Sequence, residues 1–73
     1  MPHKSPFKKE NNGTISWDAQ PGDRYVVTGI NRSGRRFSKQ FDSWQWASGI
    51  NLWRGSKWLL RDGKRHRILS VNN

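Results

Sequence analysis

The sequence predicts an α+β fold that is mostly β, with its elements in the order β-β-α-β-β. Two pairs of short strand-forming runs flank glycine-containing turns, one at Asn31 to Gly34 and the other at Asp62-Gly63. Between them, Asp42 and Ser43 are good helix N-cap residues, and a glycine follows at position 49. The sheet is expected to be antiparallel and either twisted or partly closed, with a small SH3-like or OB-like barrel as the alternative.

The first predicted hairpin covers residues 24–41. A three-residue loop, Arg32 to Gly34, would pair Asn31 with Arg35 and place odd-numbered residues opposite odd-numbered ones. A register shifted by one residue would scatter the aromatic side chains over both faces. We therefore favour the first register, which gathers large apolar residues on one face. These residues are Tyr25, Val27, Phe37 and Phe41.

The helix is predicted to be short, about residues 42–49, and to be followed by an extended segment and a turn at residues 54–56. A longer helix is the alternative, because Trp46, Ile50 and Trp53 have i, i+4, i+7 spacing. That longer helix would enclose Gly49, at a cost of about 1 kcal/mol relative to alanine.

The second predicted hairpin turns at Asp62-Gly63, and its register stays open. A three-residue loop puts Trp58, Leu60 and Ile68 on one face, whereas a two-residue turn reverses the pairing of faces. Neither register separates apolar from polar side chains, as expected for a sheet that uses both faces. We expect Trp58 in the core beside Leu59 and Leu60.

Length and composition predict one small domain over residues 13–73, preceded by a disordered basic arm over residues 1–12. In that arm, Phe7 is the only large apolar side chain. The chain has no cysteine, and its two histidines are far apart, so we expect neither a metal nor another cofactor. Stability must then come from large aromatic side chains. We expect at most one or two of the five tryptophans to be exposed.

The charge of the chain predicts a polyanionic partner. Fourteen lysines and arginines against five acidic residues give a net charge of +9 and a pI of about 11.3. We expect nucleic acid, DNA in preference to RNA, held mainly through phosphates, and a two-stranded ribbon that fits the major groove. The candidate binding residues are Arg32, Arg35, Arg36, Lys39, Arg54, Lys57, Arg61, Lys64, Arg65 and Arg67.

Two tryptophans, Trp44 and Trp53, are candidates for stacking on unpaired bases, although core packing is the competing interpretation of each. The alternative function is a protein-interaction module that binds an acidic surface of a host protein. A continuous basic stripe would favour nucleic acid, whereas basic residues around an exposed tryptophan would favour a protein partner.

No catalytic constellation is visible, so we do not expect an enzyme. The serines have no suitably placed histidine, the carboxylates are isolated, and no nucleotide-binding glycine loop precedes a helix. No apolar run approaches the roughly 20 residues of a membrane span, and no secretory signal pattern begins the chain. We therefore expect a cytoplasmic protein.

The run GINLWRGSKWLLRDGKR at residues 49–65 resembles a segment of small, basic, uncharacterised proteins from bacteriophages and other bacterial mobile elements. The resemblance covers about residues 24–72. It implies an accessory protein of a phage or plasmid and supplies no site residue.

Overall fold

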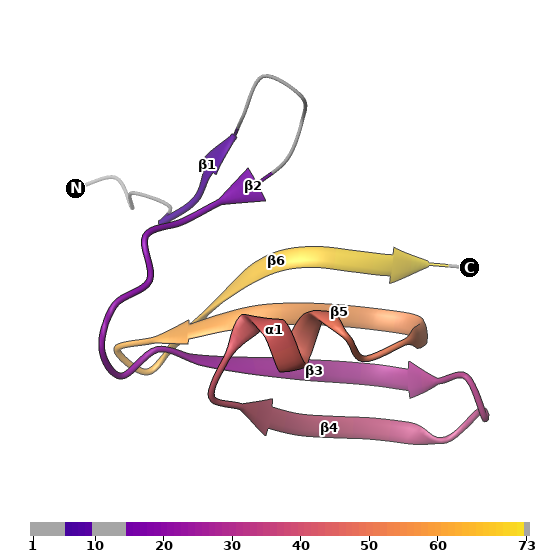
Figure 1. Ribbon diagram of the computed structural model, residues 1–73. Helices are drawn as coiled ribbons and strands as arrows, with labels where there is room; N and C mark the ends of the chain where they lie inside the picture. The colour runs from indigo at the N-terminus through magenta and orange to yellow at the C-terminus, as the bar shows by residue number, and fades with distance from the viewer. Residues whose placement is uncertain (1–5, 10–14, 73) are drawn as a thin grey trace.

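The computed structural model describes residues 6–9 and 15–72 of the chain, which form two antiparallel sheets and one short helix, α1 (Figure 1). The main sheet has four strands in the order β4-β3-β5-β6, so the predicted order β-β-α-β-β is confirmed. Within the described residues the strands do not close into a barrel. The bounds are β1 Lys8–Lys9, β2 Ile15–Ser16, β3 Arg24–Asn31, β4 Arg36–Phe41, α1 Trp44–Ser48, β5 Leu52–Arg61 and β6 Lys64–Asn72.

Helix α1 returns the chain from edge strand β4 across one face of the main sheet, so that β5 pairs with β3 (Figure 1). Its predicted capping is confirmed, because the Ser43 side chain accepts a hydrogen bond from the Trp46 amide and Gly49 ends the helix. Since neighbouring strands are antiparallel, the β3–β4 turn and the β5–β6 turn lie at opposite ends of the sheet.

The predicted register of the β3–β4 hairpin is confirmed. Tyr25 pairs with Phe41, and the Asn31 amide donates a hydrogen bond to the Arg35 carbonyl at 2.9 Å across the three-residue loop. The Asn31 side chain also accepts hydrogen bonds from the amides of Ser33 and Arg35, which holds the loop closed.

The β5–β6 hairpin has the two-residue turn. Both central residues have positive φ, 52° at Asp62 and 75° at Gly63, as a tight turn between twisted strands requires. A β-bulge follows: Trp58 pairs with Arg67 and Lys57 with the residue at position 69, which leaves Ile68 as the extra residue. Ile68 is buried in the core, and the alternation of β6 changes after it, so no single alternation could sort this strand.

The core lies between the main sheet and α1. Tyr25, Val27 and Leu59 from the sheet are buried against Ala47 of the helix. Trp17 extends this core, with its ring centroid 6.1 Å from that of Tyr25, and its indole nitrogen donates to the Tyr25 hydroxyl at 3.2 Å. Helix α1 and the segment around β2 therefore cover the same face of the sheet.

The predicted turn at residues 54–56 is wrong, because these residues lie inside β5. Gly55 stands directly opposite Gly29 of β3, and both have positive φ, 146° and 141°. A Cβ atom at Gly29 would lie 2.5 Å from the Gly55 Cα. The two glycines thus allow a close approach of the central strands that another residue type would prevent.

The predicted disordered arm can be compared with the structure only at residues 6–9. There Lys8 and Lys9 form β1 and pair with β2, and the Phe7 ring packs against Trp17 with centroids 5.7 Å apart. Phe7 is thus packed against the core, whereas the side chains of Lys8 and Lys9 are exposed. The remainder of the predicted arm lies outside the described residues.

Candidate nucleic-acid interface

We call the face of the main sheet opposite α1 the open face, because no described helix or strand packs on it (Figure 1). Alternation along β3 sends Tyr25 and Val27 to the core and Val26, Thr28 and Ile30 to the open face, where Val26 is nevertheless buried. The strand register then arranges its side chains in rows across the sheet. One row is Gln40, Val26, Trp58 and Arg67; the next is Ser38, Thr28, Ser56 and Ser70; the third is Arg36, Ile30, Arg54 and Asn72.

The middle row consists of four small hydroxyl side chains, and we call it the hydroxyl row. Arginines flank it on both sides, with Arg67 in one neighbouring row and Arg36 and Arg54 in the other. A further row places Arg24 and Arg65 on either side of Leu60. None of these described register positions holds an acidic residue.

One arginine of the open face, Arg24, forms an ion pair with Asp42, whose side chain is exposed, at 3.2 Å. In the described part of the chain, no carboxylate lies within ion-pair distance of Arg36, Arg65 or Arg67. The positive charge of these three side chains is therefore not neutralised within the described protein.

Trp58 lies on the open face, although sequence reasoning placed it in the core. Leu59 occupies the core position instead and is fully buried. The Trp58 indole nitrogen donates a hydrogen bond to the Thr28 hydroxyl at 3.0 Å, and the Arg67 guanidinium carbon lies 4.8 Å from the centre of the indole ring. This arrangement is a cation–π contact on a half-buried aromatic platform.

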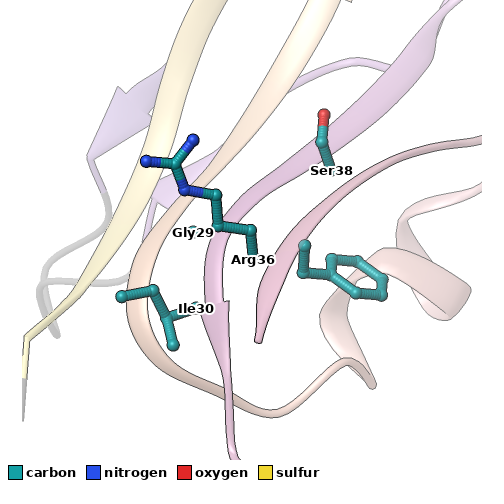
Figure 2. Close-up of a pocket in the computed structure, with 5 residues that line it drawn as sticks. Gly29, Ile30, Arg36 and Ser38 are labelled. Carbon is teal, nitrogen blue, oxygen red and sulfur yellow. The ribbon is translucent and has the colours of Figure 1, made fainter. Parts of the chain in front are cut away.

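A shallow pocket of about 430 Å³ lies at the β4 end of the hydroxyl row (Figure 2). Ile30 supplies an apolar wall, and Arg36 and Ser38 supply hydrogen-bond donors. In Figure 2, the three side chains project from neighbouring strands β3 and β4 around this hollow. The remaining lining residues are Gly29 and Phe37.

Lys57, a predicted phosphate ligand, has a structural role instead. Its ammonium group donates hydrogen bonds to the carbonyl oxygens of Ser48 at 2.9 Å and Ile50 at 2.7 Å, at the C-terminal end of α1. The residue is buried, and this burial lowers the pKa of Lys57 below its ordinary value. Lys57 therefore fastens the helix to the sheet and does not face the surface.

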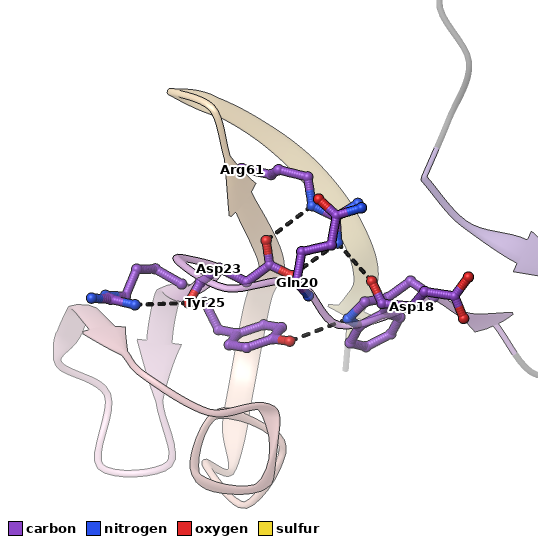
Figure 3. Close-up of polar contacts among 7 residues, drawn as sticks. Asp18, Gln20, Asp23, Tyr25 and Arg61 are labelled. Carbon is purple, nitrogen blue, oxygen red and sulfur yellow. Dashed lines mark hydrogen bonds and ion pairs between the residues drawn. The ribbon is translucent and has the colours of Figure 1, made fainter.

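Arg61, another predicted phosphate ligand, is also held inside the fold (Figure 3). Its guanidinium donates two hydrogen bonds to the buried carboxylate of Asp23, at 2.9 and 2.8 Å, and a third to the carbonyl of Asp18 at 3.0 Å. The bonds from Arg61 lower the pKa of Asp23, and in return they raise the pKa of Arg61. The pair joins the end of β5 to the loop before β3.

The other predicted basic residues occupy three places. Arg32 and Arg35 are exposed in the β3–β4 loop, and Lys64 follows the β5–β6 turn at the opposite end of the sheet. Lys39 faces the α1 side, with its nitrogen 5.5 Å from the centre of the Phe41 ring. The hairpin tips therefore do not form one surface. The predicted binding residues that lie on the open face are Arg36, Arg54, Arg65 and Arg67.

Sequence reasoning missed two parts of this surface, Arg24 and the hydroxyl row. The favoured register of the first hairpin carried a signal for both, because it places Arg24, Thr28 and Ser38 on the face that does not hold Tyr25. The contribution of β5 and β6 to the row could be assigned only after the turn and the bulge were known.

The two predicted stacking residues differ in accessibility. Trp44 is half-buried, with its ring centroid 5.3 Å from that of Trp17. Trp53 is 43% exposed, and the Arg54 guanidinium carbon lies 5.1 Å from its ring centre. Trp46 is 72% exposed, which makes two exposed tryptophans, as predicted. Trp46 also borders a pocket of about 430 Å³ on α1, together with Gln45, Gly49 and Ile50.

Among the residues that the structure describes, no group of His, Asp or Glu side chains is arranged to hold a metal ion. The only helix in this part of the chain has five residues, far short of a membrane-spanning length. Comparisons with protein families, with curated proteins and with solved structures find no match to this chain. The resemblance to proteins of phages and mobile elements therefore stays a prediction.

Proposed function

We propose that this protein is a non-enzymatic nucleic-acid-binding protein that holds DNA on the open face of its main sheet, chiefly through phosphates. The observation that carries the proposal is the alignment of arginines from all four strands on a face whose described positions include no acidic side chain. Fixed cations on one face attract a polyanion and release its condensed counterions, which favours binding.

The chemistry of the side chains supports phosphate contact in particular. Arginine presents a planar fork of donors that matches phosphate oxygens, and serine and threonine hydroxyls are common phosphate ligands. Each strand of the open face carries both types, for instance Arg36 and Ser38 on β4. The net charge of +9 adds long-range attraction to this local arrangement.

The experiment is a titration of the pure protein with labelled DNA oligonucleotides at two salt concentrations. We expect affinity to fall steeply with salt, because each neutralised phosphate of a duplex contributes about −0.9 to the slope of log K against log salt. Arg36→Gln with Arg67→Gln should weaken binding strongly. Lys39→Gln should weaken it less, since Lys39 lies on the α1 side. Dissociation constants above about 100 µM at low salt for every oligonucleotide would overturn the proposal.

The proposal has a biological setting. With DNA as its partner, the protein would act in the cytoplasm of a bacterial host. The resemblance of residues 49–65 to proteins of mobile elements adds the setting of an accessory protein of a phage or plasmid.

One observation favours a second candidate function, binding of an acidic host protein. Trp46 is the most exposed of the large apolar side chains in the described chain, and it borders a pocket on α1. This surface and the open face lie on opposite sides of the sheet. Trp46→Ala should therefore leave DNA affinity unchanged. The second function replaces the first if DNA does not bind and an acidic protein binds the wild type but not the Trp46→Ala variant.

A further inference from the structure

We infer that the open face takes a single DNA strand in preference to a duplex, and that this strand crosses the β-strands along the hydroxyl row. The inference rests on the nucleic-acid function proposed above and specifies its ligand. Three features support it: the width of the sheet, the chemistry of the hydroxyl row, and the stacked pair formed by Arg67 and Trp58.

The width of the sheet argues against insertion into a duplex. Four strands spaced about 4.8 Å apart span roughly 14 Å before side chains are added, whereas the major groove is only about 12 Å wide. A single hairpin would be narrow enough. However, the two turns lie at opposite ends of the sheet, so a duplex that received one turn would miss the arginines near the other.

The hydroxyl row provides a line of short donors between longer cationic side chains. Thr28 accepts a hydrogen bond from the Trp58 indole, which leaves its own hydroxyl hydrogen free to bind a phosphate oxygen. Neighbouring rows stand two residues apart along each strand, roughly 6.8 Å. A phosphodiester backbone above the hydroxyl row is therefore within reach of Arg67 from one side and Arg36 from the other.

The contact between Arg67 and Trp58 offers a flat surface to an unpaired base. The guanidinium group lies over the indole ring at 4.8 Å, and unpaired bases stack on guanidinium planes as well as on aromatic rings. In a duplex, the faces of the bases are already occupied by neighbouring bases. This contact therefore favours a single strand.

The pocket at the β4 end of the row completes the surface. Its Ile30 wall fits the apolar face of a second base, and Arg36 and Ser38 can donate hydrogen bonds to base-edge acceptors or a phosphate (Figure 2). Thr28, which pairs with Ser38, connects the pocket to the Trp58 indole. The two base-binding positions thus belong to one continuous surface.

The test compares an oligodeoxythymidylate of about 12 nucleotides with a duplex of the same length, both labelled, by fluorescence anisotropy. We expect the single strand to bind about tenfold more tightly. If about four phosphates are neutralised, its salt slope should be about −2.8, at −0.7 per phosphate of a single strand. Equal or tighter binding of the duplex would overturn this inference and leave the proposed function standing. Binding of neither ligand would overturn both.

Three variants locate the strand. Ser38→Leu fills the β4 end of the hydroxyl row without a change of charge, at an exposed edge position that tolerates leucine. Arg67→Gln removes the stacked cation, and Lys39→Gln removes a charge from the other face as the control. We expect the first two to reduce the preference for the single strand severalfold and the control to preserve it. If all three preserve the preference equally, the strand does not lie on the hydroxyl row.

Discussion

The guanidinium carbon of Arg67 lies 4.8 Å from the centre of the Trp58 indole ring, on the open face of the sheet. The same indole donates a hydrogen bond to Thr28, so side chains of β6, β5 and β3 are connected in sequence across this face. The two-residue turn sets Arg67 opposite Trp58, and the bulge lies just beyond this pair, between Trp58 and Lys57. The cationic platform therefore depends on the register that the turn sets, whereas the bulge sets the pairing of the β6 residues that follow it.

Trp58→Ala should lower the free energy of unfolding by about 2 kcal/mol, which is less than the roughly 3–5 kcal/mol for a core aromatic, because Trp58 is only half-buried. Trp58→Phe keeps an aromatic ring and loses the hydrogen bond to Thr28, so about 1 kcal/mol is expected. Urea denaturation measures both values. A loss near 4 kcal/mol for the alanine variant would show that the ring is a core residue after all.

Lys57→Met should destabilise the protein by roughly 1–3 kcal/mol, because the carbonyls of Ser48 and Ile50 would lose their buried donor. The variant should bind DNA with a salt slope like that of the wild type, since the ammonium group does not face the surface. Thermal unfolding and an anisotropy titration check the two expectations. A shallower slope with unchanged stability would instead make Lys57 a phosphate ligand.

Gly29→Ala should destabilise the main sheet severely, by more than about 2 kcal/mol, because both its φ of 141° and the Gly55 Cα oppose a Cβ atom. Gly34→Ala is the matched control, since Gly34 also has positive φ, 86°, but a Cβ atom added there would meet no atom within 4 Å. Circular dichroism melts of the two variants measure the difference. Equal losses would show that the close approach of β3 and β5 contributes nothing.

The register of the first hairpin was predictable because a single shift decides which side chains share a face. Tyr25, Val27 and Phe41 are large and apolar, so the hydrophobic effect selects one register strongly. Asn31 and Gly34 also suit the three-residue loop. The capping of α1 was predictable because it also depends on local residue types: Ser43 serves as N-cap and Gly49 ends the helix.

The second hairpin was not predictable to the same degree, because a bulge at Ile68 changes the alternation of the β6 residues that follow it. The destinations of Lys57 and Arg61 were hidden for another reason. Their partners, the carbonyl of Ile50 and the carboxylate of Asp23, are brought to them only by tertiary structure. A count of basic residues in the sequence treats all of them as surface charges. Only the folded structure divides them between the core and the surface.

The ion pair of Asp23 and Arg61 should make stability depend on pH in the acidic range. Hydrogen bonds from Arg61 hold the pKa of Asp23 below its ordinary value of 3.8 in the folded protein. A carboxyl group with a lower pKa in the folded state contributes stability that is present above the unfolded-state pKa and lost as pH falls through the folded-state pKa. We therefore expect the thermal midpoint to fall as the pH decreases below about 4.

Arg61→Gln should lower the midpoint at neutral pH and flatten its acid dependence, because the pKa of Asp23 would no longer be lowered by the guanidinium group. Arg24→Gln is the matched control: it also removes an arginine that pairs with an aspartate, but the side chain of Asp42 is exposed and such pairs contribute little. Calorimetric melts between pH 2 and pH 7, at intervals of about one unit, compare the three proteins. A profile of Arg61→Gln that runs parallel to the wild type below about pH 4 would contradict the role of Asp23.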